Sequence, residues 1–254
     1  MNTHLIVANW KMNPESKEKA KAIVSEIESK IKKVKSVRVV ICPPFVFLNE
    51  VAKSISSSKK LYLGAQDLFI GEGVSHTGEI SPKMLKNAGA KYIIVGHSEK
   101  RELSDNDEMV REKLLGALKE GFKTILCVGE KERDAHGKYY QFLKNQLESA
   151  LTSLPKKFIK NLIIAYEPVW AIGKSEKEAM KPEQLNEMAI FIKRVVSDTL
   201  HYKEINKLPV LYGGSVTFGN GKDIVEKGNV NGLLVGRESL EAEHFFKLIK
   251  EISK

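Results

Sequence analysis

Cysteine is scarce in this sequence, with only two among 254 residues, Cys42 and Cys127. Each lies inside a short apolar run, at 39–42 and 125–128, of the kind that forms a buried strand. Two thiols in separate buried runs indicate free cysteines in a reducing compartment and argue against a disulfide framework. The six histidines also lack the spacing of metal ligands, so we expect neither a metal nor another cofactor.

Long hydrophobic runs are missing as well. No apolar stretch approaches the length that spans a membrane, and residues 1–4 carry no basic segment followed by an apolar one. We therefore expect a cytoplasmic protein with no membrane partner. This expectation agrees with the cysteine usage, because free thiols persist in the cytoplasm.

Positive charge is plentiful but scattered. The formal net charge is +9, from 41 Lys and Arg against 32 Asp and Glu, and most of the excess is lysine along helical stretches. No arginine cluster or interleaved aromatic stripe accompanies it, so a solvated lysine-rich surface explains the charge better than a nucleic-acid-binding face. The same charge would steer a small anionic substrate toward the protein.

Eight short apolar runs rich in β-branched residues recur along the chain. Their near-continuous apolar character predicts strands buried on both faces, as in a parallel sheet covered by helices. The runs lie at 5–8, 37–41, 61–63, 92–95, 124–128, 162–165, 209–212 and 232–235.

Helical patterns separate these runs. The apolar residues between 20 and 34 fall on one helical face, and Ser81-Pro82 is a typical start of another helix. A cap at 104–107 begins a helix that would stop at Gly121. Further helices are predicted at 141–154, at 182–200 and around Phe245.

Eight alternations of strand and helix without a linker favour one (β/α)8 barrel domain that comprises residues 1–254. The alternative on pattern alone is a doubly wound open sheet. That alternative is weakened because no Gly-x-Gly-x-x-Gly motif follows the first run.

The carboxyl ends of the strands form the active face of such a barrel. Glu167 follows the run 162–165 in this position, and Pro168 behind it cannot continue a sheet ladder. Trp170 and Gly173 then add a large aromatic side chain and a flexible point, a combination typical of a base beneath a hinged lid. The alternative is an ordinary strand-to-helix loop with a solvated Glu.

The first run is followed by a second set of polar side chains. Asn9 and Lys11 should project together, because residues two apart on a strand point the same way. Trp10 and Met12 should then pack elsewhere. Taken alone, Lys11 has the alternative of being a solvated loop lysine.

His97 follows the fourth run. It shares the parity of Ile93 and Val95, which predicts that its imidazole points toward the mouth of the barrel. The alternative is a structural histidine that only satisfies hydrogen bonds.

Glycines follow the seventh and eighth runs, in Gly213-Gly-Ser215 and at Gly236. Glycine lets backbone N–H groups approach an anion at a helix N-terminus. Turns explain most glycine pairs, but the loops after strands seven and eight are where a barrel holds phosphate. With Lys11, His97 and Glu167 on the same face, the site would abstract a proton next to a carbonyl in a small phosphorylated compound. Lys11 and His97 would stabilise the oxyanion without a metal.

Seven motifs spread along the chain resemble those of triosephosphate isomerases and occur in the same order. One motif alone is weak, but the series is highly specific for that family. The motifs are Asn9-Trp-Lys-Met-Asn13, Thr77-Gly-Glu79, Gly96-His-Ser-Glu99, Cys127-Val-Gly-Glu130, Ala165-Tyr-Glu-Pro-Val-Trp-Ala-Ile-Gly173, Tyr212-Gly-Gly-Ser-Val216 and Leu234-Val-Gly236. This family is itself the standard example of a Glu base paired with a neutral His beneath a lid.

The resemblance implies a TIM barrel that interconverts dihydroxyacetone phosphate and D-glyceraldehyde 3-phosphate in glycolysis and gluconeogenesis. It also implies roles for individual residues. Glu167 would move a proton from C1 to C2, and His97, as a neutral imidazole, would shuttle protons between the enediolate oxygens. Lys11 would pair with substrate charge and Asn9 would help to hold the oxyanion, whereas Glu99 would pair with Lys11.

The resemblance further implies that backbone N–H groups bind the substrate phosphate. The residues concerned are Gly173, Ser215, Gly236 and Arg237. Closure of the lid at 168–173 would exclude water and suppress elimination of phosphate from the enediolate.

A homodimer also follows from the resemblance. Thr77, Gly78 and Glu79 lie in a segment that in this family reaches from one subunit into the site of its neighbour. Without the resemblance, 66–79 is a long surface loop, whose length without an obvious helix only modestly favours a function.

The chain departs from the family pattern in four places. The stretch 174–181 lengthens the second hinge of the lid, which predicts a working lid with changed opening kinetics. Arg237 stands where a second glycine is common, and a positive φ there would be strained. Lys100 replaces a usual arginine and weakens a bidentate ion pair. His76 stands where another aromatic is frequent in the dimer loop.

Two other functions stand as alternatives. One is another phosphate-binding barrel, such as a sugar-phosphate epimerase or an indole-pathway synthase. The joint presence of Lys11, His97 and Glu167 argues against it. The other is a catalytically silent barrel that binds a partner through its positive charge, and the intact catalytic positions argue against that.

Overall fold

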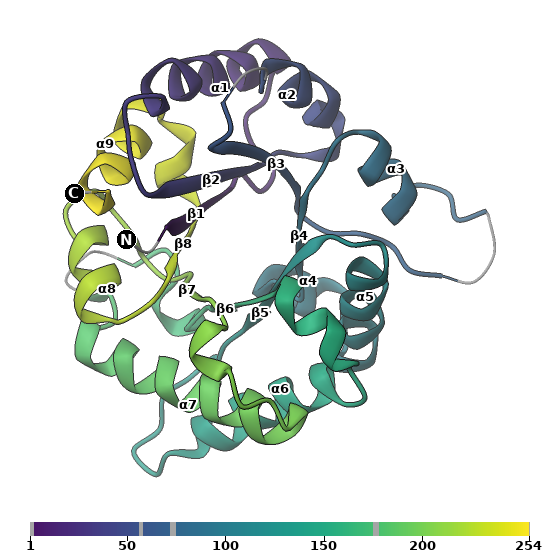
Figure 1. The fold of residues 1–254 in the computed structure, drawn as a ribbon, viewed down its shortest axis with the longest axis vertical. Helices are drawn as coiled ribbons and strands as arrows, with labels where there is room; N and C mark the ends of the chain where they lie inside the picture. Colours follow the sequence, from purple (N-terminus) through teal and green to yellow (C-terminus); the bar gives the residue numbers. More distant parts are fainter. Residues whose placement is uncertain (1–2, 56–57, 72–74, 175–177, 254) are drawn as a thin grey trace.

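The structure is a computed structural model that describes residues 3–55, 58–71, 75–174 and 178–253. Eight parallel strands form a closed barrel in which each strand pairs with the next and β8 pairs with β1 (Figure 1). The strands are β1 (His4–Asn9), β2 (Val37–Cys42), β3 (Leu61–Ala65), β4 (Tyr92–Val95), β5 (Lys123–Val128), β6 (Leu162–Tyr166), β7 (Val210–Tyr212) and β8 (Gly232–Val235). The predicted (β/α)8 barrel is confirmed, as are all eight predicted strands, whose ends shift by no more than about two residues.

Each strand alternates between two apolar environments. One hydrophobic cluster contains only strand residues, such as Val7 of β1 and Ile163 and Ala165 of β6, and therefore fills the barrel interior. The other cluster joins the opposite strand faces, such as Ile6, to the surrounding helices. Burial on both faces explains why the strands read as continuous apolar runs.

Helices surround the barrel on all sides (Figure 1). None in the described part of the chain has both the length and the apolar character to cross a membrane. The helices are α1 (Lys17–Ile31), α2 (Leu48–Ser54), α3 (Pro82–Asn87), α4 (Ser98–Leu103), α5 (Asp107–Lys119), α6 (Lys138–Leu151), α7 (Pro182–Leu200), α8 (Gly221–Lys227) and α9 (Ala242–Ile252). Short 3-10 segments lie in the connections, at η1 (Phe45–Phe47), η2 (Lys156–Asn161), η3 (Val169–Ala171), η5 (Ile205–Lys207) and η6 (Arg237–Leu240).

Most of the predicted helix limits are confirmed. The Ser81 hydroxyl caps α3 by accepting a hydrogen bond from Met84 N at 3.2 Å, and α7 coincides with the predicted 182–200. The cap of α5 is Asn106, inside the predicted 104–107, and Gly121 follows the end of that helix with φ 88°. α6 begins at Lys138 rather than 141. The short helix α4, directly after β4, was not predicted.

Candidate active site

Glu167 lies at the carboxyl end of β6 and is almost completely buried, with 2% of its surface exposed. Its backbone N–H still bonds to Val128 O of β5 at 2.8 Å, so the residue continues the regular ladder. Its carboxylate accepts a hydrogen bond from Ser98 N (3.3 Å to Oε2), and Oε1 lies 3.2 Å from His97 Nε2. The alternative of a solvated loop carboxylate is therefore wrong.

The two cysteines are free and buried, as predicted. Cys127 lies beneath Glu167 in the barrel interior. Burial and, after it, the Glu167 carboxylate raise the pKa of the Cys127 thiol well above its usual range. The thiol therefore stays neutral beside the Glu167 carboxylate.

His97 is the N-cap of α4 and is buried, with its ring held in a defined orientation. Glu99 N donates to His97 Nδ1 at 3.2 Å, so Nδ1 carries the lone pair. The proton of a neutral imidazole is then on Nε2, the nitrogen that faces Glu167. A donor directed at the carboxylate fits an electrophile that works beside a base.

His97 lines the cavity at the barrel mouth as predicted, but the reason given, its alternation with Ile93 and Val95, is wrong. Ile93 and Val95 face the helices, whereas Ile94 belongs to the interior cluster. Regular alternation would therefore turn His97 away from the barrel mouth. Gly96 has φ 71°, a left-handed conformation that breaks the alternation and returns the next residue to the rim.

Lys11 and Asn9 meet at the end of β1, as predicted. Lys11 Nζ lies 2.6 Å from Glu99 Oε1. Its backbone has φ 52°, and Lys11 N donates to Asn9 Oδ1 at 3.1 Å. Gln66 Nε2 donates to Lys11 O at 2.8 Å and to Cys42 O at 2.9 Å, so a residue from the end of β3 fixes this unusual backbone.

Trp10 and Met12, which alternate with Asn9 and Lys11, differ in burial. Trp10 packs in the core as predicted. The prediction for Met12 is wrong, because 92% of its surface is exposed. The positive φ at Lys11 ends the strand geometry, so the alternation no longer applies one residue later.

The predicted catalytic and phosphate-binding residues line one cavity of about 500 Å³ at the carboxyl ends of the strands. They are Asn9, Lys11, His97, Glu99, Glu167, Gly173, Ser215, Gly236 and Arg237. The cavity is large enough for a three-carbon phosphate, and acidic and basic groups line it at the ends of β1, β4 and β6. Glycines after β7 and β8 and the start of η6 line its wall between β6 and β1.

The segment after Glu167 covers this cavity from one side. The Ser215 hydroxyl lies 2.8 Å from Ala171 O and 2.9 Å from Lys174 O and can donate its proton to either. It thereby ties this segment to the loop after β7. Gly173 has φ 73°, a left-handed conformation that favours glycine. The predicted change in the hinge falls partly on 175–177, outside the described residues.

Comparison with known proteins identifies the family. A family model described as triosephosphate isomerase matches residues 4–252. The chain belongs to the triosephosphate isomerase family. It is 39% identical to the triosephosphate isomerase of Natranaerobius thermophilus over 248 residues, which cover 97% of this chain and 94% of that protein. It is also 39% identical to the enzyme of Thermoanaerobacter pseudethanolicus over 251 residues, 98% of this chain and 99% of the relative.

Two departures from the triosephosphate isomerase pattern have no structural cost. Arg237 begins η6, and it is not one of the residues with positive φ, so the expected strain does not occur. The ring of His76 packs against that of Phe69 with centroids 4.6 Å apart, so His76 takes the place of an aromatic within its own loop. The predicted dimer residues Thr77, Gly78 and Glu79 are exposed and do not line the cavity of their own chain.

Sequence reasoning assigned no role to Glu130, which follows β5 and is buried. Its carboxylate accepts hydrogen bonds from Tyr166 Oη (2.8 Å), Trp170 Nε1 (2.8 Å) and Arg133 Nε (3.2 Å). Burial and then Glu130 itself raise the pKa of the Tyr166 hydroxyl far above its usual range, so Tyr166 remains a donor. The segment 168–173 of this triosephosphate isomerase homologue is therefore anchored through Trp170. The sequence feature that could have identified Glu130 is its position after the end of a predicted strand.

Replacing Trp170 with Phe should loosen this anchor. Trp170→Phe removes the indole donor but leaves Glu130 with two other partners. A hydrogen bond to a charged group contributes about 1.5–3 kcal/mol, so we expect the free energy of unfolding in urea to fall by that amount. Turnover should change only severalfold. An unchanged urea midpoint would mean that the indole bond does not hold the lid.

Proposed function

We propose that this chain interconverts dihydroxyacetone phosphate and D-glyceraldehyde 3-phosphate through an enediolate, as a step of glycolysis and gluconeogenesis. One observation carries the proposal. The Glu167 carboxylate lies 3.2 Å from His97 Nε2, and Lys11 lines the same cavity. A base, a neutral donor and a cation around one cavity are the groups needed to remove a proton next to a carbonyl and to stabilise the resulting oxyanion.

Glu167 is the proposed base. It takes the proton from C1 of dihydroxyacetone phosphate and returns it at C2. Its Oε2 is held by Ser98 N before substrate binds, so the carboxylate has to leave this donor to reach carbon. Glu167 directly precedes Pro168 and the lid, and closure of the lid can supply this movement.

His97 and Lys11 are the proposed electrophiles. The Nε2–H of neutral His97 donates to the substrate oxygens and moves protons between them as the enediolate forms and collapses. Lys11 places its positive charge beside the substrate, and Glu99 keeps that ammonium in position at 2.6 Å. Asn9 helps to hold the oxyanion.

The phosphate is proposed to bind at the β7–β8 side of the cavity. Its ligands are backbone N–H groups of Gly173, Ser215, Gly236 and Arg237, which line the cavity. The positive end of the turn at η6 adds favourable electrostatics. Closure of the lid over this side excludes water and protects the enediolate from losing phosphate.

A coupled assay of the purified protein tests the proposal. Dihydroxyacetone phosphate should be converted to D-glyceraldehyde 3-phosphate, which a dehydrogenase then oxidises with a change in absorbance. The control is the Glu167→Gln variant, which lacks a base but preserves the size of the side chain. Absence of isomerisation in the unaltered protein would reject the function, and epimerisation of a larger sugar phosphate would favour the other class of barrel.

We also propose a homodimer in the cytoplasm, with each copy of 1–254 acting as one barrel domain. Thr77, Gly78 and Glu79 would contact the partner. Exposed apolar side chains support this interface, because Met12, Val46 and Met84 follow the neighbouring strands β1, β2 and β3 on one sector of the rim. These side chains would be covered by a second copy.

The dimer gives a prediction about Met12. The unaltered protein should sediment at twice the chain mass of 28.5 kDa. Met12→Glu buries a charge in the proposed interface and should shift the protein toward monomer as it is diluted, with a parallel loss of activity. Ile190→Glu, at another exposed apolar position on α7, should leave the dimer intact. A monomer in the unaltered protein would reject the interface.

A further inference from the structure

Helix α4 carries three groups of the site but has no apolar anchor. His97 is its N-cap, Ser98 N contacts Glu167, and Glu99 pairs with Lys11. None of the six residues of α4, all described, is buried. Its only large apolar side chain, Leu103, is 80% exposed. Since hydrophobic burial does not hold α4 in place, polar contacts have to do so.

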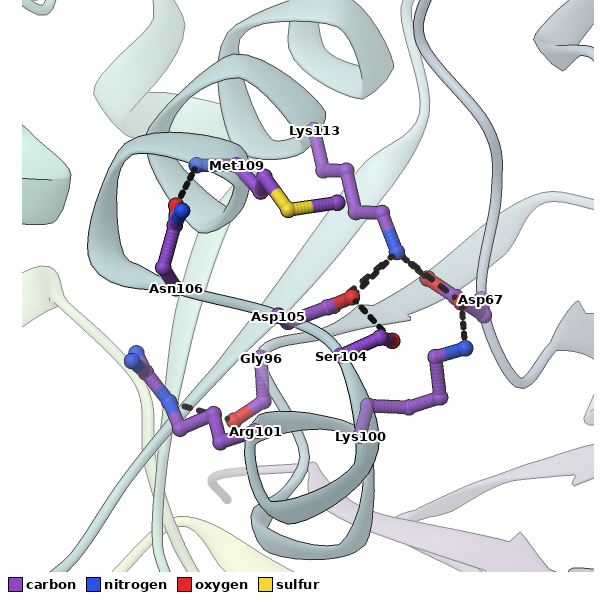
Figure 2. A network of polar contacts seen from close by, with 9 residues as sticks. All are labelled: Asp67, Gly96, Lys100, Arg101, Ser104, Asp105, Asn106, Met109 and Lys113. Atoms are coloured by element: carbon purple, nitrogen blue, oxygen red, sulfur yellow. Dashed lines mark hydrogen bonds and ion pairs between the residues drawn. The ribbon is translucent and has the colours of Figure 1, made fainter.

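The polar contacts at the far end of α4 form a quartet of Asp67, Lys100, Asp105 and Lys113. Lys113 of α5 has only 7% of its side chain exposed, and its Nζ contacts both carboxylates. Its distances are 2.8 and 3.0 Å to the Asp67 oxygens and 3.0 and 2.9 Å to the Asp105 oxygens. Lys100 of α4 adds a contact of 3.1 Å to Asp67. Figure 2 shows Lys113 Nζ between the two carboxylates, with Lys100 reaching Asp67 from α4.

The quartet is balanced in charge, with two carboxylates and two ammonium groups. Partial burial lowers the pKa of Lys100, but Asp67 and Asp105 more than compensate and raise it, so Lys100 stays charged. Charged groups with good geometry and opposite partners tolerate burial, whereas removal of one partner leaves an uncompensated charge. The four side chains of the quartet therefore hold one another in a single arrangement.

The quartet is joined to α4 by the backbone as well. Ser104 N and Asp105 N both donate to Lys100 O at 2.8 Å, so the carboxylate of Asp105 is fixed relative to the last turn of α4. Within α4, Arg101 Nε donates to Gly96 O at 2.9 Å (Figure 2). Because α4 has fewer than two turns, a rotation at its far end moves its first residues.

The quartet also lies beside the residue that fixes Lys11. Asp67 directly follows Gln66, whose side chain donates to Lys11 O. Two consecutive residues after β3 thus hold both partners of the Lys11–Glu99 ion pair, one through the backbone of Lys11 and the other through α4. The quartet is therefore placed to fix the Lys11 ammonium relative to the Glu167 carboxylate and the His97 imidazole.

We propose that the quartet is a positioning device for the reaction, which sets the orientation of α4 and so holds His97 Nε2 and Ser98 N against Glu167. This inference rests on the proposed isomerase function. None of its four residues lines the cavity, so the quartet would act only through α4. Their contribution therefore belongs to the rate of the chemical step rather than to substrate binding.

The test removes one matched pair of charges. The double variant Asp105→Asn/Lys113→Met leaves the quartet neutral and keeps the Lys100–Asp67 contact, so it avoids an unpaired buried charge. We expect kcat to fall about tenfold with KM changed less than about twofold, because a small misplacement of catalytic groups lowers the rate. In ¹⁵N NMR, the His97 ring signals should shift, because Nε2 loses its defined position beside Glu167.

Two controls separate positioning from a loss of stability. Glu108→Gln/Arg111→Met removes an exposed ion pair from the same helix, α5, without touching α4. Leu248→Ala weakens the core at α9, on another side of the barrel (Figure 1). Both controls should retain kcat and the His97 signals. Equal losses of kcat in Leu248→Ala, or an unchanged kcat in the quartet variant, would overturn the inference.

The experiments distinguish failure of the proposed function from failure of the positioning role. An unaltered protein that does not isomerise triose phosphates would reject that function. The NMR comparison would still decide about the quartet, because the His97 signals do not depend on turnover. Identical His97 signals in the unaltered protein and the quartet variant would contradict the positioning role.

Discussion

Glu167→Asp is expected to lower kcat by about a hundredfold or more, with little change in KM. The change withdraws the carboxylate by one methylene, and a displacement of about 1 Å at a reacting group costs on the order of a hundredfold. The phosphate would bind to backbone N–H groups rather than to this carboxylate, so substrate affinity should change little. The coupled assay at saturating and subsaturating substrate separates the two constants.

The environment of Glu167 makes this a sharp test. The carboxylate is buried between His97 and Ser98 N, and it cannot recover its reach by moving freely in solvent. Glu132→Asp makes the same chemical change at an exposed position and should leave both constants unaltered. A loss smaller than about threefold in Glu167→Asp would mean that another group takes the proton.

The sequence was sufficient to predict the orientation of a site residue at β6. Its alternation was readable because the strand stays regular up to Tyr166, and Glu167 N continues the ladder to β5. Because side chains two apart on a strand point the same way, the interior position of Ile163 and Ala165 extends to Glu167. Burial on both faces of the strands similarly made the barrel predictable.

The same reasoning failed where the backbone leaves the strand geometry. At Gly96 and Lys11 a positive φ changes the direction of the next side chain. The alternation of a regular strand therefore does not explain the orientation of His97, and it wrongly predicted that Met12 packs within the chain. A sequence signals glycine at such a point but not lysine, which rarely adopts this conformation. At Lys11 this conformation is held by Asn9, two residues before it, and by Gln66, which is 55 residues away in the sequence.

Buried charges were also invisible in the sequence. Lys113 and Glu130 resemble the many solvated charges of this chain, and only the tertiary structure brings their partners to them. Helix α4 gave no signal for a related reason. Its position depends on polar contacts rather than on an apolar face, and apolar periodicity is what identifies a helix in sequence.

His97→Gln provides the second large expected effect, a loss of kcat of about a hundredfold or more, since proton transfer by a positioned side chain contributes about 10²–10⁴-fold. Glutamine can reach toward Glu167, but its amide cannot pass protons between two oxygens as an imidazole does. His136→Gln, at an exposed position, is the matched control and should retain full activity.

Solvent exchange distinguishes the role of His97 from that of Glu167. In D₂O the His97→Gln variant still has its base, so it should form the enediolate and incorporate deuterium into recovered dihydroxyacetone phosphate faster than it makes product. Glu167→Gln should show neither exchange nor product. The difference follows from the geometry, because the Glu99 N to Nδ1 bond leaves Nε2 as the imidazole's donor. If both variants lost exchange to the same extent, the imidazole would be acting on proton abstraction at carbon, and the division of labour between the two side chains would be wrong.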